Sequence, residues 1–146
     1  MSSFGTLCNS SRFACTDAAA DPQSAAVIRR DFSDWLQQHF ALDATKACDM
    51  VLAVNEAMAN AAEYAYLTAD QPGVMQVQAD YDVSAATLTV TVTDHGAWRR
   101  SEAATRQLKR GRGIPLMEAL ADRATVDASP TGTRVCLEWN EVSPAR

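Results

Sequence analysis

The chain has 146 residues, the length of one ordinary domain, and can bury a core without disulfides or metals. Hydrophobic residues make up 47% of it and charged residues 21%, as in soluble globular proteins, and the net charge of −5 disfavours a dedicated nucleic-acid binder. No apolar run reaches the ~18 residues of a membrane span. We therefore expect one domain over residues 1–146, with no direct nucleic-acid or membrane partner.

The first half of the chain predicts two helices. Residues 1–8 are polar and are expected to be loose, and a first strand is predicted over residues 11–16. Asp21 and Pro22 then mark a helix start, with Asp as N-cap and Pro in the first turn. Apolar residues follow at steps of three and four: Ala25, Ile28, Phe32, Trp35, Leu36 and Phe40. Asp43 can cap a second helix over about residues 44–66, whose many alanines favour helix and close packing.

The second half predicts mainly antiparallel strands. After a turn at residues 67–73, residues 75–81 and 87–93 alternate apolar and polar side chains, and the short link between them predicts a hairpin. A long connection, 95–112, leads to a short helix, 114–120, and to a second strand pair, 124–128 and 133–139. This order predicts an α+β fold, a two-layer sandwich of a mixed, mainly antiparallel sheet on about three helices.

The cysteines and the N-terminal residues indicate the cellular compartment in which the protein is expected. Cys8, Cys15, Cys48 and Cys136 form no CxxC pair and suit neither a zinc site nor a compact disulfide framework. We interpret them as mostly buried small hydrophobes in a reducing cytosol. Because the N-terminus has no basic start followed by an apolar stretch, we expect a cytoplasmic protein.

Three polar residues of the second helix share one face. Glu56 and Asn60 are four residues apart, and Glu63 falls on the same stripe. They can be simply the solvated side of an amphipathic helix. Glu-x-x-x-Asn also has a chemical use, because a carboxylate can accept a proton and an amide oxygen is a hard ligand that suits Mg²⁺.

An aspartate follows the second strand of the hairpin. Asp94-His95-Gly96 can be an ordinary Asp-x-Gly turn. A carboxylate at a strand end can also accept a hydrogen bond from an exocyclic amine such as that of adenine, and Gly96 would let the backbone approach the base.

Two glycine motifs follow. Gly111-Arg112-Gly113 directly precedes the short helix that starts at Ile114, where free N–H groups and the helix dipole favour phosphate. The segment is neither a Walker motif nor a Rossmann fingerprint, because Gly-Lys-Ser/Thr and the third glycine are missing. Gly132-Thr133 is either a tight turn or a hydroxyl that faces a base pocket.

Six of the 13 cationic residues lie between residues 97 and 112, with Glu102 as the one acid among them: Arg99, Arg100, Arg106, Lys109, Arg110 and Arg112. Such a run is a solvated loop or an anion-binding loop. Its place before Gly111 favours the second interpretation.

The order of these motifs, E-x-x-x-N, then D-x-G, G-x-G-I and G-T, resembles the ATP-binding superfamily of gyrase, the heat-shock chaperone, histidine kinases and the mismatch-repair ATPase, with the histidine-kinase-like ATPase (Bergerat) fold. Within it, N-E-A-M-A-N-A-A-E-Y-A-Y, V-T-D-H-G-A-W-R and G-R-G-I-P-L-M look like the anti-sigma regulatory factor serine/threonine kinases. The resemblance covers roughly residues 20–140.

The resemblance implies ATP and Mg²⁺ as cofactors and a role for each matching position. Asn60 would hold Mg²⁺, and Glu56 would act as general base or orient the attacking hydroxyl. The other implied nucleotide contacts are Asp94, Gly96 and Thr133 on adenine and Gly111, Arg112, Gly113 and Ile114 on phosphates. The implied function is an anti-sigma factor that phosphorylates its antagonist and so switches partners.

The implied partners are a sigma factor and an antagonist with a STAS-type domain. Relatives of this type often dimerise, and the sequence leaves open whether this chain forms a homodimer. One departure concerns Trp98, which replaces the second glycine of the D-x-G-x-G found in many relatives. It puts turnover in question, so the alternative is a nucleotide-binding interaction module without strong kinase activity.

Overall fold

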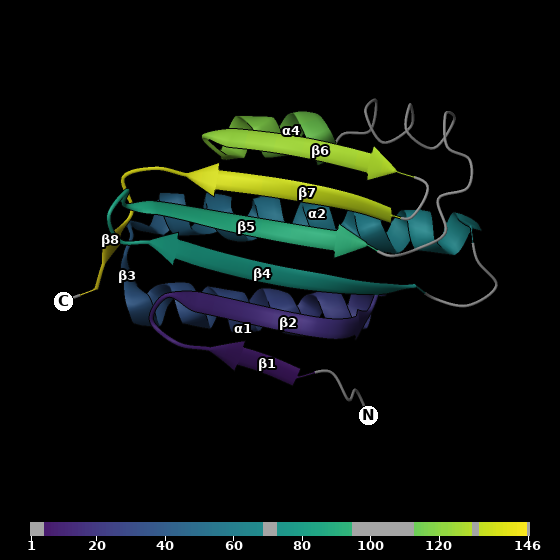
Figure 1. Cartoon of the computed structure of the whole chain (residues 1–146), viewed down its shortest axis with the longest axis horizontal. Helices are drawn as coiled ribbons and strands as arrows, with labels where there is room; N and C mark the ends of the chain where they lie inside the picture. Colours follow the sequence, from purple (N-terminus) through teal and green to yellow (C-terminus); the bar gives the residue numbers. More distant parts are fainter. Residues whose placement is uncertain (1–4, 69–72, 95–112, 130–131, 146) are drawn as a thin grey trace.

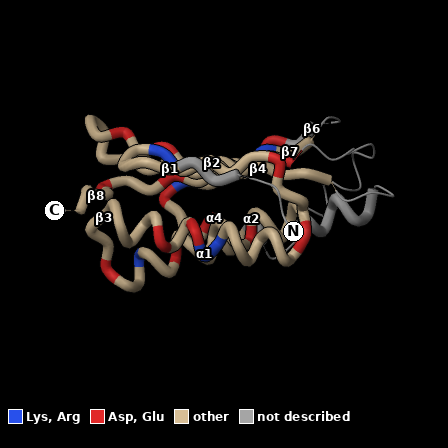
Figure 2. Tube along the Cα trace, turned by 90° about the horizontal axis from the view of Figure 1, so that it is seen from below, with Lys and Arg blue, Asp and Glu red and all other residues tan. Residues whose placement is uncertain are grey.

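The computed structural model describes residues 5–68, 73–94, 113–129 and 132–145. These residues form two layers, a sheet on one side and helices on the other (Figures 1 and 2). The helices are α1 (Pro22–His39), α2 (Ala44–Thr68) and α4 (Gly113–Leu120). In the part of the chain described, no helix is both long and apolar enough to cross a membrane.

Six strands form the main sheet in the order β1-β2-β4-β5-β7-β6, and every neighbouring pair is antiparallel. Their bounds are β1 (Gly5–Cys8), β2 (Arg12–Ala19), β4 (Val74–Asp82), β5 (Thr87–Asp94), β6 (Arg123–Ser129) and β7 (Gly132–Trp139). Two further short strands, β3 (Phe40–Ala41) and β8 (Ser143–Pro144), pair with each other beside it. The α+β two-layer sandwich predicted from the sequence is confirmed.

Local sequence signals explain where the helices begin. The Asp21 carboxylate accepts a hydrogen bond from the Ser24 N–H at 2.7 Å, and Pro22 occupies the first turn of α1. Asp43 accepts from the Lys46 N–H at 2.7 Å in the same way at the start of α2. Both predicted caps are confirmed.

The core lies between the sheet and the helices. In β5, Leu88, Val90 and Val92 are buried while the intervening threonines are half-buried on the other face, which is the period of two expected of a strand. Helix α2 packs against α1 on one side, against α4 on the other, and over β5 and β7. This central helix therefore covers the middle of the sheet, and its C-terminal end extends past the ends of the strands (Figure 1).

Three expectations differ from the structure. Residues 5–8 form the edge strand β1, paired to β2, although their polar composition predicted a loose segment. The sequence predicts residues 141–146 as a tail, whereas in the structure β8 pairs with β3 and Val142 is fully buried. Only Cys15 is buried; Cys8 and Cys48 are exposed and Cys136 is half-buried, so the predicted burial of the cysteines is wrong for most of them.

Candidate nucleotide site

Two buried polar residues lie opposite each other at one end of the sheet. Asp94 is the last residue of β5 and pairs in register with Thr133, the second residue of β7. Asp94 is 1% exposed and Thr133 6%, the only charged or polar side chains besides Ser24 that are buried in the described part of the chain. Because directly opposed residues of an antiparallel pair share a face, both side chains point to the helical layer.

The buried face of β5 and β7, formed by every second side chain, ends at Asp94 and Thr133. One step further into the sheet, Val92 pairs with Val135 on the same buried face. At the entry to β7, Gly132 has a φ of 149°, a region that glycine adopts readily and residues with a Cβ do not. The apolar face of the sheet thus ends in a carboxylate and a hydroxyl.

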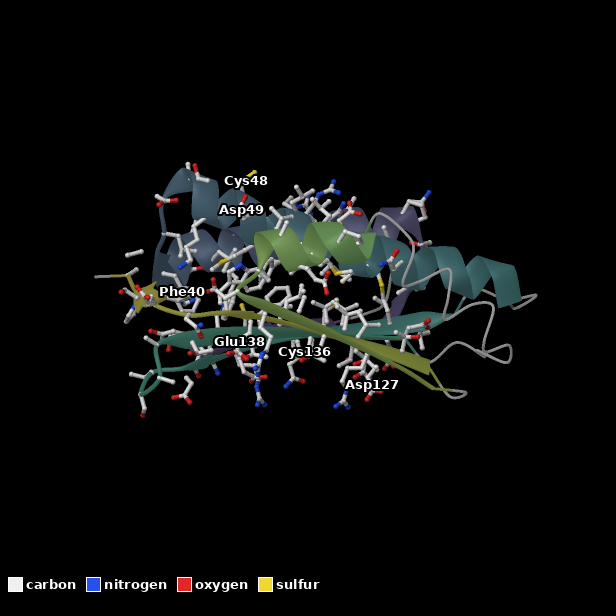
Figure 3. The ribbon with its side chains drawn as sticks, turned by 90° about the horizontal axis from the view of Figure 1, so that it is seen from above. Phe40, Cys48, Asp49, Asp127, Cys136 and Glu138 are labelled. Carbon is white, nitrogen blue, oxygen red and sulfur yellow. The ribbon has the colours of Figure 1, made fainter. Side chains whose placement is uncertain are left out.

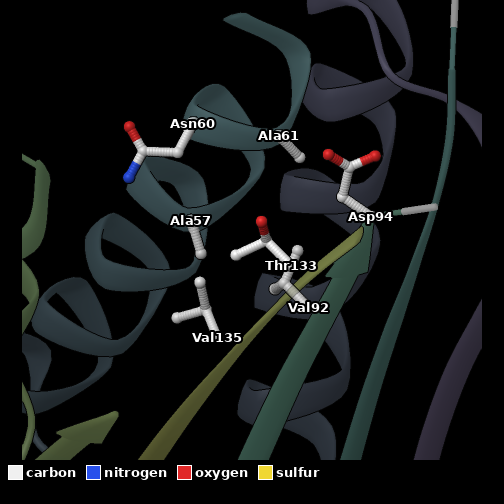
Figure 4. A pocket seen from close by; sticks show the side chains of 7 residues that line it. All are labelled: Ala57, Asn60, Ala61, Val92, Asp94, Thr133 and Val135. Atoms are coloured by element: carbon white, nitrogen blue, oxygen red, sulfur yellow. The ribbon is translucent and has the colours of Figure 1, made fainter. Parts of the chain in front are cut away.

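Helix α2 supplies the other wall of a pocket over these residues. Figure 4 shows Asn60 and Asp94 on opposite sides of the pocket, with Thr133 between them. Seven side chains line it: Ala57, Asn60, Ala61, Val92, Asp94, Thr133 and Val135. The empty space between them is about 240 Å³, part of it open to solvent. The two alanines matter because longer side chains at these positions would fill that space.

Two polar atoms of this pocket are buried without a hydrogen-bond partner among the described residues. They are the amide nitrogen Nδ2 of Asn60 and the hydroxyl Oγ1 of Thr133. Buried polar groups in folded proteins are nearly always paired, and leaving one unpaired costs about 1–3 kcal/mol. Two such atoms beside one pocket therefore indicate a polar ligand.

These donors and acceptors fit a nucleotide and its metal. The Thr133 hydroxyl can donate or accept, and the Asp94 carboxylate can accept from an exocyclic amine. The Asn60 amide carries a donor, Nδ2, and an acceptor, Oδ1, and an oxygen of this kind is the ligand that Mg²⁺ requires. In proteins, Mg²⁺ at nucleotide sites usually takes one or two protein ligands, with phosphate and water oxygens as the others.

Of the other site residues predicted from the sequence, some lie in the described part of the structure and some lie outside it. Glu56 is half-buried one helical turn before Asn60 and does not line the pocket. Gly113 begins α4, and Ile114 lies in its first turn, so a helix does start directly after the glycine segment. Gly96, Gly111 and Arg112 lie outside the described residues, as do Trp98 and the basic run.

Four lining residues carry no chemical signal and were not predicted from the sequence: Ala57, Ala61, Val92 and Val135. Only their spacing from the polar residues along the helix and the strands could have indicated that they line the same pocket. Ala57 and Ala61 lie three residues before and one after Asn60, and each valine lies two residues from its polar neighbour on the same strand face. Such residues give the pocket its shape and its apolar floor.

The fold and the pocket define an ATPase domain of the histidine-kinase type. Residues 18–139 match the family model of the histidine kinase-like ATPase domain. The chain belongs to this family, and the superfamily resemblance predicted from its motifs is confirmed. Family membership implies that the nucleotide bound is ATP.

Among solved structures, the chain is similar to the RsbU and RsbW domains of Rv1364c from Mycobacterium tuberculosis. The TM-score is 0.70 at 25% sequence identity, and the match covers 92% of this chain and 34% of that one. The chain therefore spans about a third of the length of the matched chain, which holds two domains.

Proposed function

We propose that the chain is an anti-sigma factor that binds ATP between α2 and the β5–β7 strand ends and phosphorylates a serine or threonine of its antagonist. One observation carries the proposal: Asp94 and Thr133, paired in register, face Asn60 across a pocket in which two buried polar atoms lack partners. The similarity to a chain with an RsbW domain supports the anti-sigma assignment.

Each residue has a separate task in the proposal. Asp94, with Thr133 and Gly96, binds the adenine edge. Asn60 supplies an oxygen ligand to Mg²⁺, which when bound neutralises phosphate charge. The start of α4 at Gly113 and Ile114, together with Gly111 and Arg112, offers N–H groups and cationic charge to the phosphates.

The proposed chemistry is phosphoryl transfer. The hydroxyl oxygen of the acceptor serine forms a bond to the γ-phosphorus of ATP, the bond from that phosphorus to the β,γ-bridging oxygen breaks, and ADP leaves. Glu56, one turn before Asn60, orients the hydroxyl and accepts its proton. Positioning and charge neutralisation supply most of the rate enhancement in reactions of this kind.

The two protein partners would be a sigma factor and an antagonist with a STAS-type domain. They would compete for overlapping surfaces, so phosphorylation of the antagonist decides which of them is held. The proposal places the protein in the cytoplasm, where the transcription machinery is, and it includes a homodimer as the form that relatives often adopt.

A second function is favoured by one observation. Trp98 replaces a glycine that many relatives have in the segment after the adenine-binding aspartate. A bulky residue at a hinge position would slow the movement of that segment, and turnover with it. The alternative is therefore a nucleotide-binding module that holds its partners and uses ATP as a structural ligand.

A single assay separates the two functions. The purified chain is incubated with γ-labelled ATP, Mg²⁺ and candidate antagonist domains, and phosphoserine or phosphothreonine is sought in the antagonist. Stoichiometric transfer within minutes supports the kinase. Tight ATP binding without transfer to an antagonist that demonstrably binds supports the module, and absence of ATP binding contradicts both.

A further inference from the structure

A second hollow lies at the other end of the helical layer. It is formed by the first turns of α2, the end of α4 and one strand residue, and we call it the α2–α4 groove: Asp43, Thr45, Lys46, Asp49, Ala119, Leu120, Ala121, Asp122 and Trp139. Its empty space is about 640 Å³, part of it open to solvent, against about 240 Å³ for the nucleotide pocket. Figure 3 shows Asp49 on α2 next to α4.

Hydrogen bonds hold the rim of the groove in place. The Asp122 carboxylate accepts from the Asn140 N–H at 2.7 Å, and the Lys46 ammonium donates to the Asn140 carbonyl at 3.1 Å. Asp43 caps α2 through the Lys46 N–H. The α2 start, the α4 end and the segment after β7 are thus tied together, so the groove is a fixed feature of the fold.

The groove carries excess negative charge. Three carboxylates and one ammonium line it, which leaves two negative charges uncompensated. That ammonium is directed to a backbone carbonyl, and within the described segments none of the three carboxylates has an ion pair within 4.0 Å. Asp43 and Asp122 each use one oxygen in the rim, which leaves the other to accept from a ligand.

The base of the groove is apolar and rigid. Trp139 is 2% exposed, and its indole Nε1–H donates to the Leu120 carbonyl at 2.9 Å. Leu120 is half-buried, and Ala121 is 9% exposed. An apolar base below an acidic rim suits a side chain with an aliphatic stem and a cationic head.

We propose that the α2–α4 groove is a docking site for a protein segment that presents arginine or lysine beside an apolar side chain. The inference deepens the proposed function, on which it rests for the existence of a protein partner, and assigns that partner a surface and a chemistry. Charge complementarity of this kind sets specificity and the rate of association.

The groove is separate from the nucleotide pocket. Trp139 lies six residues after Thr133 on β7, about 20 Å away at the usual rise of a strand. A partner can therefore occupy the groove while ATP is bound. Helix α2 and strand β7 contribute residues to both hollows, so the docked segment contacts two elements that also line the nucleotide pocket.

The test uses a defined probe, the peptide acetyl-Leu-Arg-Leu-Arg-amide, titrated into the ¹⁵N-labelled full chain at low salt. We expect saturable shifts of the Trp139 indole signal and of backbone amides in residues 45–49 and 119–122. Affinity should fall at least fivefold when citrulline, which has a similar shape but no charge, replaces arginine, and it should weaken as salt is added.

Charge reversal sharpens the test. Asp49 makes no hydrogen bond or ion pair with the described residues, so Asp49→Lys should leave the frame of the groove intact while weakening the arginine peptide at least fivefold and strengthening a glutamate version. The matched control is Asp34→Lys, at an exposed position of α1, which should change neither affinity. ATP affinity should be the same in all three proteins.

Several results would overturn the assignment. They are the absence of shifts in the groove, equal affinity for arginine and citrulline, or an unchanged affinity in Asp49→Lys. Shifts of the same amides on simple dilution of the chain would show that a second copy covers the groove. If the peptide binds as expected while ATP does not bind, the docking site stands and the proposed kinase function fails.

Discussion

The two ends of the β5–β7 strand pair lie under the same helix, α2, but they differ in whether their buried polar groups have hydrogen-bond partners. At one end Leu88 pairs with the buried Trp139, whose indole N–H is bonded to the Leu120 carbonyl. At the other end Asp94 pairs with Thr133, whose hydroxyl is buried without a partner in the described structure. At the first end the polar group is hydrogen-bonded within the fold, whereas at the second end the Thr133 hydroxyl is left for a ligand to bind.

This difference separates stability from function along one pair of strands. Changes at the Leu88–Trp139 end should lower the free energy of unfolding and spare nucleotide binding. Changes at the Asp94–Thr133 end should lower ATP affinity, and loss of the Thr133 hydroxyl should leave the free energy of unfolding unchanged or higher. Five variants test the comparison: four around the nucleotide pocket, in order of decreasing effect on phosphotransfer or ATP binding, and then one at the Leu88–Trp139 end, where no effect on ATP binding is expected.

The largest effect is expected from Glu56→Gln, which removes the proposed base beside the nucleotide end. General-base removal costs on the order of 10²–10⁴ in rate, while the nucleotide contacts stay in place. Single-turnover phosphotransfer to a verified antagonist should fall at least a hundredfold with near-normal ATP affinity. A parallel loss of affinity and rate would make Glu56 a structural residue instead.

Asp94→Asn should lower ATP affinity about tenfold or more. The asparagine side chain has the size of aspartate, but an NH₂ donor replaces one of the two acceptor oxygens. If that donor faces the amino group of adenine, the buried pair is mismatched, which costs about 1–3 kcal/mol. Calorimetric titration measures the change, and Asp34→Asn, an exposed carboxylate of α1, is the matched control. If the folded Asp94 variant binds like the wild type, the adenine contact lies elsewhere.

Asn60→Ala should abolish the gain in ATP affinity that magnesium gives. The change removes a neutral oxygen ligand from an ion that requires near-octahedral geometry. ATP titrations with magnesium and with chelator should give the same affinity in the variant and different affinities in the wild type. A magnesium effect that survives would assign the metal to another residue, with Glu56 and Glu63 as the next candidates.

Thr133→Val should lower ATP affinity without lowering the free energy of unfolding. Valine has nearly the shape of threonine and removes a buried hydroxyl that lacks a partner, so the free energy of unfolding should stay the same or rise by up to about 1 kcal/mol. ATP affinity should fall severalfold. Urea denaturation and nucleotide titration on the same preparation check both, and a clear loss of stability would mean that the hydroxyl is satisfied within the fold.

Trp139→Phe is the reverse case at the opposite end of β7. It removes the indole donor to the Leu120 carbonyl and leaves a small void, which should lower the free energy of unfolding by roughly 1–3 kcal/mol. ATP affinity, measured below the unfolding transition, should not change. Weakened nucleotide binding would show that the two ends are energetically coupled.

Much of the fold could be predicted because local signals are strong where they occur. Asp21 and Pro22 announce α1, and the alternation in β4 and β5 gives both strands to within a residue or so. The edge strand β1 could not be predicted, because four residues of mixed polarity become a strand only when β2 is beside them.

The candidate site was also predicted only in part, because local sequence signals identify its polar residues but not how the strands pair. Asn60, Asp94 and Thr133 carry polar chemistry in a recognisable order, and the structure brings all three to one pocket. The register that sets Asp94 opposite Thr133 depends on strands almost forty residues apart, so sequence patterns alone could not supply it. The α2–α4 groove was missed because its residues come from three distant segments, none with a motif.

The most direct test of the nucleotide site is an ATP titration of the ¹⁵N-labelled chain with magnesium. The expected result is saturable shifts of the backbone amides of Ala57, Asn60, Val92, Asp94, Thr133 and Val135, with little change in residues 43–49 around the α2–α4 groove. Shifts confined to another part of the chain, or none at millimolar ATP, would contradict the assignment of this pocket to ATP.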